Sequence, residues 1–405
     1  MNRAVLAAIG DELLSGARLE KNCNFMARHF HNKGWNLQRI EIISDEEQEI
    51  LNLLSRWVGH TDLLIISGGL GPTHDDKTRN AIAKFLNCGL SCENELYDKI
   101  LERVKDDPKR YAYTESVRDP QAMIPELARP VFNPTGFALG IKFQKDNTTV
   151  IALPGVPLEY ESMTRQELPE IFSSDNKDYA WTSIIILDVP ELTIAQKIPE
   201  VINNQALHVS ILPAFPQVEL IIRGRPEEVS KAEKIIRSRF PDALPEGCRS
   251  IAEAVLFEAE MKGLKISCAE SCTGGLLGAT LTEIPGSSEV FNGSAVTYSN
   301  EAKKNILGVS EDTLKNFGAV SEECALEMSK GSLKVYGTDF AVSTTGIAGP
   351  DGGSKAKPVG LVCFCVASEK NFKTFKRIFP GGRQEIRTRA TRFALSELWK
   401  EIHNL

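Results

Sequence analysis

The stretch SCAESCTGG, residues 267–275, places hydroxyls, thiols, a carboxylate and two glycines directly after an apolar run. The preceding GLKISCA predicts a strand and the following LLGATLTEI a helix, so residues 270–275 form the turn between them. Ligands of α/β sheets bind outside the carboxyl ends of the strands. We therefore expect Ser271 to present its hydroxyl at the rim of a sheet, where it is a candidate nucleophile.

A serine hydroxyl needs a base, and this part of the chain offers few. Its one histidine, His403, lies in a terminal segment that we expect to fray, which argues against a Ser-His-Asp triad. The segment GSAVTYSNEAKKNIL predicts a strand, a helix cap at Ser299 or Asn300, and a helix that carries Lys303 and Lys304. Burial and a helix N-terminus both lower the pKa of a lysine from its usual value of about 10.4. Both lysines also fit a solvated helix surface, the common location of this residue.

Two further segments of this region could bind an anion. The glycine-rich FAVSTTGIAGPDGGSKAKPVG follows a strand pattern, and it either lines an oxyanion or phosphate pocket with its N–H groups or forms a long flexible loop. In FPGGRQEIRTR, Arg383 and Arg387 lie four residues apart at a helix start and share one face. These two guanidinium groups would suit a phosphomonoester, or they could pair with Glu385 or other surface carboxylates.

A second glycine loop lies near the start of the chain. The segment LLIISGGLGPTHDDKT predicts a strand, then Gly68, Gly69 and Gly71, and then a helix that opens between Thr73 and Asp76. Glycines let backbone N–H groups approach a phosphate closely, and a helix N-terminus adds favourable partial charge. This loop is therefore a candidate phosphate site.

Carboxylates at this loop conflict with a bare phosphate. Asp75 and Asp76 would repel it, unless a divalent cation such as Mg²⁺ lies between carboxylate and phosphate oxygens. Asp11 and Glu12 follow the first strand and are expected on the same rim as a second acidic group. The alternative interpretation is that the two aspartates only cap the helix.

Composition restricts the class of protein. At 405 residues the chain exceeds one ordinary core, so two or three domains are expected. No window has the roughly 18 uncharged apolar residues of a membrane span, and the initial AVLAAIG indicates a strand and not a signal peptide. The nine cysteines lack the C-x-x-C pairs of zinc sites, which predicts buried thiols in a reducing cytosol. A net charge of −7 disfavours a nucleic-acid partner.

The order of the patterns predicts three domains. Strands and helices alternate in the first third, as in an α/β domain with a mostly parallel sheet. The polar FSSDNKDYAW, residues 172–181, suits a linker, and a βαββα module follows it. The last region alternates again and ends in the long helical pattern RQEIRTRATRFALSELWKEI. The predicted domains are residues 1–172, 173–245 and 246–405.

At its motifs the sequence resembles the competence/damage-inducible CinA family over nearly its full length. The motifs GDELLSG, SGGLGPTHDD, LPGVP, AESCTGG, VTYSNEAK, GAVSEE, STTGIAGPDGG and KPVG occur in the order of that family. The resemblance implies an N-terminal molybdopterin-binding-like α/β domain of the MoaB/MogA type, a KH-like α+β middle module and a C-terminal α/β amidohydrolase domain. It also implies a cytoplasmic homodimer that recycles pyridine nucleotides.

Two activities are implied by the resemblance. The C-terminal domain would hydrolyse the carboxamide of nicotinamide mononucleotide (NMN), releasing ammonia and nicotinic acid mononucleotide without a metal. The N-terminal domain would cleave the pyrophosphate of ADP-ribose to AMP and ribose 5-phosphate with a divalent metal. A binding module for a pterin or nucleotide without turnover, and a competence or DNA-repair accessory protein, are the alternatives.

The resemblance also assigns residues. Ser271 would be the nucleophile and Lys303 its base, with Tyr298 and Glu270 orienting the pair. The residues that would bind NMN are Thr273, Gly274, Gly275, Thr345, Gly346, Arg383 and Arg387. The residues that would bind ADP-ribose are Asp11, Glu12, Gly68, Gly69, Gly71, Thr73, Thr78 and Asn133, and those that would hold its metal are Asp75 and Asp76.

The chain departs from the family pattern in two places. In NPTGFALG, Phe137 and Leu139 stand where the family usually has Thr and Pro, and a bulky Phe137 could narrow a nucleotide pocket. This departure bears on the pyrophosphatase activity predicted for the N-terminal domain. The middle module has no G-x-x-G loop between its helices, which disfavours RNA binding.

Overall fold

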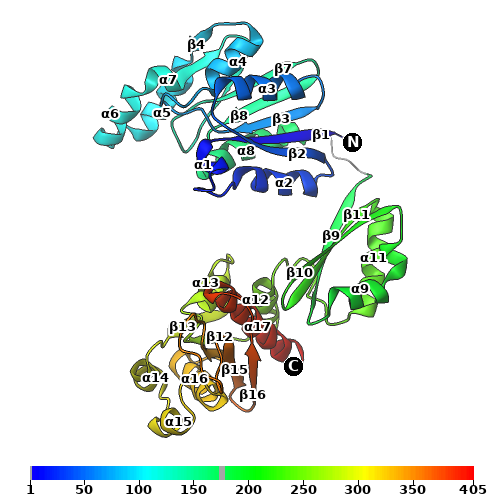
Figure 1. The fold of residues 1–405 in the computed structure, drawn as a ribbon, viewed down its shortest axis with the longest axis vertical. Coiled ribbons are helices and arrows are strands. Elements are labelled where there is room, and N and C mark those ends of the chain that lie inside the picture. The colour runs from blue at the N-terminus through cyan, green and yellow to red at the C-terminus, as the bar shows by residue number, and fades with distance from the viewer. Residues whose placement is uncertain (1, 173–177) are drawn as a thin grey trace. The chain divides into compact units, whose positions relative to one another are not determined.

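The chain folds into two compact units, an N-terminal unit of residues 1–180 and a C-terminal unit of residues 181–405. The computed structural model describes residues 2–172 and 178–405. Part of the predicted linker, residues 173–177, therefore lies outside the described residues. Figure 1 shows that each unit combines sheets and helices, so the chain is of the mixed α/β class, as predicted.

The N-terminal unit is built around a six-stranded sheet with the order β2-β1-β3-β8-β7-β6. Strands β2, β1, β3 and β8 are parallel to one another. Strand β7 is antiparallel to both of its neighbours, β8 and β6. The strands are β1 (Arg3–Ile9), β2 (Asn36–Ile43), β3 (Leu63–Ser67), β6 (Arg129–Val131), β7 (Gly140–Lys145) and β8 (Thr148–Leu153). A separate two-stranded sheet pairs β4 (Leu90–Cys92) with β5 (Met123–Pro125).

Helices cover both faces of this sheet. Side chains of β1 alternate between two hydrophobic clusters, with Val5 and Ala7 in one and Ala4 and Leu6 in the other. Helices α3 and α4 supply the first cluster, and α2 and α8 supply the second, on the opposite face in Figure 1. The helices are α1 (Asp11–Leu14), α2 (Asn22–Asn32), α3 (Glu47–Trp57), α4 (Thr78–Leu86), α5 (Asn94–Val104), α6 (Pro108–Ser116), α7 (Arg118–Ala122) and α8 (Pro157–Ile171).

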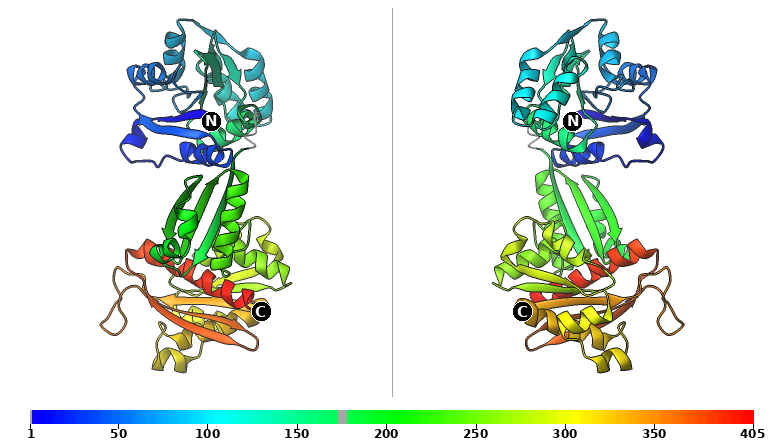
Figure 2. Two further views of the ribbon diagram at one scale, coloured as in Figure 1. Left: turned by 90° about the vertical axis from the view of Figure 1, so that its right-hand side faces the viewer. Right: turned by 90° about the vertical axis from the view of Figure 1, so that its left-hand side faces the viewer.

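The C-terminal unit contains two sheets. A three-stranded sheet has the order β10-β11-β9, and Figure 2 shows its helices beside the strands. Its elements are β9 (Ala180–Leu187), α9 (Glu191–Lys197), α10 (Pro199–Ile202), β10 (Leu207–Ala214), β11 (Gln217–Gly224) and α11 (Pro226–Arg239). This order confirms the βαββα pattern expected from the sequence.

The second sheet of this unit has the order β13-β12-β14-β15-β16. Its strands are β12 (Ile266–Glu270), β13 (Phe291–Val296), β14 (Phe340–Gly346), β15 (Leu361–Ser368) and β16 (Phe372–Ile378). Helices α12 and α17 pack on one face, and α14 and α16 pack on the other. The helices are α12 (Ile251–Met261), α13 (Leu276–Thr282), α14 (Asn300–Leu307), α15 (Glu311–Asn316), α16 (Glu322–Tyr336) and α17 (Arg383–His403), with a 3₁₀ turn at Ser287–Glu289.

Two local predictions are corrected. The helix after the SGGLG loop begins at Thr78 and not between Thr73 and Asp76, because the side chain of Asp76 binds the loop's own N–H groups instead of starting a helix. His403 is not frayed, since its Nδ1 lies 2.7 Å from a carboxylate oxygen of Glu258 and its ring stacks on Trp399.

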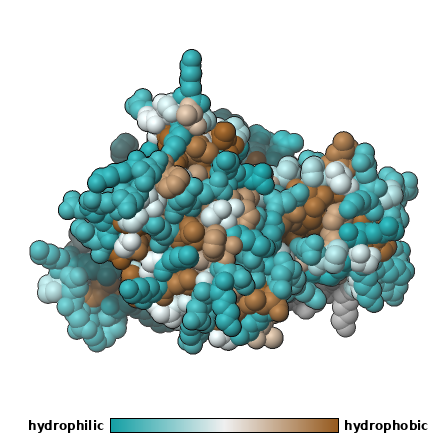
Figure 3. All heavy atoms as spheres, turned by 90° about the horizontal axis from the view of Figure 1, so that it is seen from below, coloured by the Kyte–Doolittle hydropathy of each residue, from teal (hydrophilic) through white to brown (hydrophobic). Residues whose placement is uncertain are grey.

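The surface carries no single apolar face in the view of Figure 3, where hydrophobic side chains form separate patches among hydrophilic ones. Within residues 2–172 and 178–405, no helix is long and apolar enough to cross a membrane.

Candidate functional site

Ser271 and Lys303 meet at the carboxyl end of the second sheet. The side-chain nitrogen Nζ of Lys303 lies 2.9 Å from the Oγ of Ser271. Nζ also donates to the carbonyl oxygen of Thr297 at 2.8 Å and to that of Tyr298 at 3.4 Å. A neutral amine has two N–H groups and one lone pair. Since the two carbonyls can only accept hydrogen bonds, the lone pair of a neutral Lys303 is directed at the Ser271 hydroxyl.

The surroundings of this pair disfavour the charged lysine. Lys303 is 1% exposed and Ser271 is 7% exposed. Among the described residues, no carboxylate lies within ion-pair distance of Nζ. Burial lowers the pKa of Lys303 because the ammonium form loses its hydration. The neighbouring thiol responds oppositely, since burial raises the pKa of Cys272 to about 12 and keeps it protonated.

Local structure explains why Lys303 and not Lys304 is buried. Ser299 caps α14, as predicted, by accepting a hydrogen bond from the N–H of Ala302 at 3.0 Å. This cap sets where the helix begins, and the packing of α14 on α16 directs Lys303 inward. Lys304 is instead directed outward, where it forms a 2.6 Å ion pair with Glu311.

Glu270, expected to orient the Ser–Lys pair, makes no direct hydrogen bond to it. Its fully buried carboxylate contacts neither Ser271 nor Lys303. It accepts hydrogen bonds from the N–H groups of Gly275, Leu277 and Gly278 and from the hydroxyl of Ser294, all between 2.7 and 3.0 Å. The carboxylate thus fixes the start of α13 and the turn that carries Ser271, so Glu270 is a positioning residue.

Strand β14 holds the other side of the same turn. The N–H of Ser271 donates to the carbonyl oxygen of Thr344 at 2.9 Å, and the hydroxyls of Thr273 and Thr344 lie 2.7 Å apart. Thr345, expected at the substrate amide, donates its hydroxyl to the carbonyl of Ala319 at 2.6 Å. The side chain of Thr273 therefore holds the turn against β14, and that of Thr345 holds β14 against the segment that contains Ala319.

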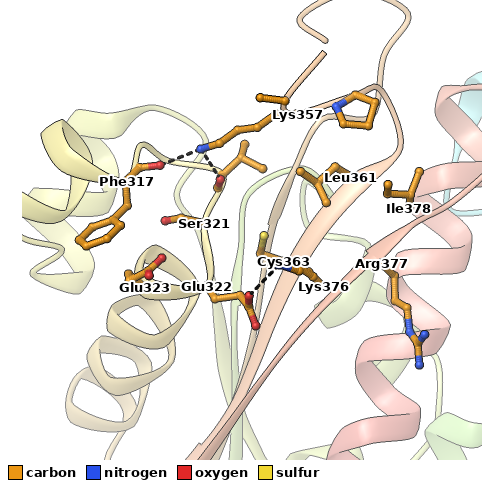
Figure 4. A pocket seen from close by; sticks show the side chains of 13 residues that line it. Phe317, Ser321, Glu322, Glu323, Lys357, Leu361, Cys363, Lys376, Arg377 and Ile378 are labelled. Atoms are coloured by element: carbon orange, nitrogen blue, oxygen red, sulfur yellow. Dashed lines mark hydrogen bonds and ion pairs between the residues drawn. The ribbon is translucent and has the colours of Figure 1, made fainter. Parts of the chain in front are cut away.

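The motifs GAVSEE and KPVG form a brace next to this strand. The ammonium group of Lys357 donates to the carbonyls of Phe317 and Val320, both at 2.7 Å. It thereby holds the segment 317–320, whose Ala319 carbonyl accepts from the Thr345 hydroxyl. A cavity of about 780 Å³ lies beside this brace (Figure 4). Lys376 and Glu322 form an ion pair in its wall, as Figure 4 shows, and neither member of the Ser–Lys pair lines it.

Two arginines of α17 lie next to the Ser271 turn. Arg387 donates two hydrogen bonds to the carbonyl of Thr273, from Nε at 3.1 Å and from Nη2 at 2.7 Å. Arg383 donates to the carbonyl of Gly349 and to the hydroxyl of Tyr298. They do not pair with Glu385, which caps α17 by accepting from Gly382. Gly349 lies in the glycine-rich loop, so the arginines connect both predicted binding segments.

The second candidate site is a cavity of about 430 Å³ in the N-terminal unit. It lies at the carboxyl ends of β1, β3 and β8. Of the residues expected to bind ADP-ribose or its metal, Glu12, Gly68, Gly69, Gly71, Asp75 and Asp76 line it. Asp11, Thr73, Thr78 and Asn133 do not.

The glycine loop is not a free phosphate cradle. The N–H of Gly68 donates to the carbonyl of Leu153, and that of Gly71 donates to the Oδ1 of Asp76 at 2.7 Å. A side chain at Gly69 would collide with the hydroxyl of Thr78. The glycines therefore allow close packing against β8 and α4, and the prediction that these N–H groups bind phosphate is wrong for Gly68 and Gly71.

Asp76 and Asn133 also serve the loops that carry them. The carboxylate of Asp76 accepts three hydrogen bonds from Gly71 and Thr73. The side-chain oxygen of Asn133 accepts from the N–H of Gly136 at 2.7 Å, and its nitrogen donates to Glu159. Asn133 thereby shapes the NPTGFALG loop from a fully buried position.

Besides Asp76, the wall of this cavity carries the carboxylates of Glu12, Asp45, Asp75 and Glu159. Glu159 accepts a hydrogen bond from Asn133, and Asp75 is exposed. Burial, followed by the charge of Asp11, raises the pKa of Asp45. Among the described residues, no three His, Cys, Asp or Glu side chains are placed to hold a metal together. Because Mg²⁺ commonly uses one or two carboxylates plus phosphate oxygens, these residues fit a metal that arrives with a phosphorylated ligand.

Comparison with known proteins agrees with both halves of this description. The family model described as "CinA C-terminal domain" matches residues 248–402, and the one described as "Probable molybdopterin binding domain" matches residues 5–173. A CinA-like protein of Pseudothermotoga lettingae is 34% identical over 100% of both chains. The chain belongs to the CinA family. Another CinA-like protein, from Thermotoga maritima, is 36% identical over 99% of this chain and 98% of its own.

A CinA structure has also been solved for part of this length. The competence/damage-inducible protein of Agrobacterium tumefaciens is 45% identical and covers 38% of this chain and 93% of its own, with a TM-score of 0.37. The two full-length relatives confirm the CinA resemblance expected from the motifs for the whole chain. The names of these relatives state neither a substrate nor a reaction.

Several residues of the two sites were missed by sequence reasoning. In the C-terminal site these are the backbone carbonyls of Thr297 and Thr344, which no side-chain pattern reveals. In the N-terminal cavity they are Asp45, Tyr113 and Glu159. Asp45 follows β2 as Asp11 follows β1, so the rule that placed Asp11 at the rim would also have found Asp45.

The capping role of Glu270 predicts a large effect on stability. Glu270→Gln would direct an NH₂ group at backbone N–H donors, so we expect the free energy of unfolding to fall by about 2–4 kcal/mol. Urea denaturation of this variant beside Glu283→Gln, a surface change at the end of α13, measures the difference. Equal stability of the two variants would contradict the assignment.

Proposed function

We propose that the C-terminal unit is a serine-dependent amidohydrolase that acts on the carboxamide of NMN. The observation that carries the proposal is the 2.9 Å contact between Ser271 Oγ and Lys303 Nζ in a buried setting, where the described residues provide no carboxylate partner. A neutral lysine beside a serine hydroxyl is an arrangement for nucleophilic attack on an amide carbonyl. NMN as the substrate is taken from the resemblance described above.

The first half of the reaction would form an ester. The Oγ of Ser271 attacks the carboxamide carbon, and Nζ of Lys303 takes the hydroxyl proton. The resulting ammonium gives this proton to the amide nitrogen, which leaves as ammonia. The carbonyls of Thr297 and Tyr298 accept hydrogen bonds from Nζ and keep it in place during these transfers.

The second half would release the acid. A water molecule attacks the ester carbon and gives one proton to Nζ of Lys303. That proton passes to Oγ of Ser271 as the ester bond breaks, which restores the free hydroxyl and leaves nicotinic acid mononucleotide. The protons balance over the two halves, because Lys303 takes and returns one proton in each.

The two arginines would hold the phosphate of the nucleotide. Arg383 is exposed and Arg387 is half-buried. Arg383 contacts the glycine-rich loop at Gly349, and Arg387 contacts the Ser271 turn at Thr273. Guanidinium groups bind phosphate oxygens with two parallel hydrogen bonds. Arg383 also donates to the hydroxyl of Tyr298 at 3.0 Å, so the side chain of Tyr298 would orient this arginine, whereas its backbone carbonyl accepts from Lys303.

For the N-terminal unit we propose metal-dependent cleavage of the pyrophosphate of ADP-ribose. The observation that favours it is the cavity whose wall combines Asp45 and Asp75 with one basic group, Arg18. Asp45 and Asp75 would hold the metal, which when bound would neutralise charge on the phosphates. Asp76 would keep the loop in shape, and Arg18 would contact a phosphate directly.

The reacting pair can be tested by substitution. Ser271→Ala and Lys303→Met should each lower ammonia release from NMN by at least about 1,000-fold, and the double variant should be no worse, because the two groups act as one unit. Lys304→Met and Cys272→Ala are the matched controls and should retain activity. Near-normal release by either pair variant, with a native far-UV spectrum, would contradict the assignment.

The burial of the lysine also predicts a pH dependence. Since burial lowers the pKa of Lys303 and the neutral amine is the base, kcat/KM for NMN should be lost as pH falls through a value below the usual lysine pKa of about 10.4. Between the lowered pKa of Lys303 in the folded state and the usual value in the unfolded state, the folded state binds fewer protons than the unfolded state. The free energy of unfolding should therefore rise with pH over this range. Lys303→Met should remove this rise. A stability profile shared by the variant and wild type would argue against a lowered pKa.

A metal titration tests the N-terminal unit. Asp75→Asn should raise the Mg²⁺ concentration needed for ADP-ribose cleavage by about 10–100-fold, because a ligand is lost. Asp106→Asn, an exposed aspartate outside the cavity, is the control. An unchanged Mg²⁺ requirement would remove Asp75 from the site, and binding of ADP-ribose without consumption by wild type would favour the non-catalytic alternative.

A further inference from the structure

Two aromatic side chains in contact with each other line the N-terminal cavity. Tyr113 of α6 and Phe137 of the NPTGFALG loop both line it, and neither belongs to the acidic loops. Their ring centroids lie 5.8 Å apart with an interplanar angle of 68°, an edge-to-face contact. Leu139, the other departure from the family pattern, is fully buried and does not line the cavity.

The two rings differ in freedom. Phe137 packs against the hydrophobic core of the unit, and the guanidinium carbon of Arg110 lies 5.8 Å from its centroid. Tyr113 is 51% exposed, so much of its ring is open to solvent. Phe137 is thus fixed, and it holds Tyr113 through the edge-to-face contact.

We propose that Tyr113 stacks on the base of a nucleotide whose phosphates lie with the metal at Asp45 and Asp75, and that Phe137 is the positioning residue for Tyr113. The proposal rests on the nucleotide site proposed above for this unit. Aromatic side chains bind planar bases through their faces, with little dependence on the identity of the base. Phe137 then forms part of the cavity wall next to the base.

Binding of ADP and of pyrophosphate to the full chain, measured by calorimetry with Mg²⁺, tests this. Both probes carry a diphosphate, and only ADP carries a base. Tyr113→Ala should weaken ADP about 10-fold and leave pyrophosphate unchanged, since a stacking contact carries about one order of magnitude in affinity. Tyr113→Phe should bind ADP like wild type. Tyr111→Ala, on the same helix but outside the cavity, is the matched control.

Phe137 needs a readout of its own. Phe137→Leu should weaken the binding of ADP and leave the binding of pyrophosphate unchanged. Phe137→Tyr should retain the affinity for ADP because it keeps the ring. The proposal is overturned if Tyr113→Ala binds ADP as tightly as wild type, if both probes weaken equally, or if wild type binds no ADP. If wild type fails to consume ADP-ribose while ADP affinity still depends on Tyr113, the proposed cleavage fails and the base site stands.

Discussion

The C-terminal site depends on one physical constraint, the burial of an amine whose partners are all neutral. Lys303 donates to two carbonyls and meets the hydroxyl of Ser271, and no carboxylate compensates its charge among the described residues. In such a setting the neutral amine is favoured, and its one lone pair can only be directed at Ser271. Burial of the Lys303 amine therefore reduces the stability of the fold and at the same time favours the neutral form that can act as a base.

The surrounding structure serves to keep this contact short. Glu270 fixes the start of α13, Thr344 holds the N–H of Ser271, and the Ser299 cap fixes the start of α14. Each of these bonds lies at the end of a strand or at the start of a helix, where backbone groups lack partners within their own element. The site is thus held by backbone groups at the ends of strands and helices that have no hydrogen-bond partner within their own element.

Sequence reasoning found the parts of this site but not all of their contacts. The strand and helix patterns placed Ser271 in a turn and Lys303 in the first turns of a capped helix, and the structure agrees. Periodicity could not show that Lys303 is buried while Lys304 is only partly buried, since this follows from how α14 packs on α16. Nor could it show that Glu270, Asp76 and Asn133 bind their own loops, because that depends on backbone N–H groups brought together by the fold.

The protonation state of Lys303 tests this mechanism most directly. NMR titration of ¹³C-labelled lysine side chains, with Lys303→Met to assign the resonance, follows that amine alone. If burial lowers the pKa of this amine, Lys303 will lose its proton at a lower pH than the surface lysines do. A Lys303 resonance that titrates together with that of Lys304 would contradict the mechanism.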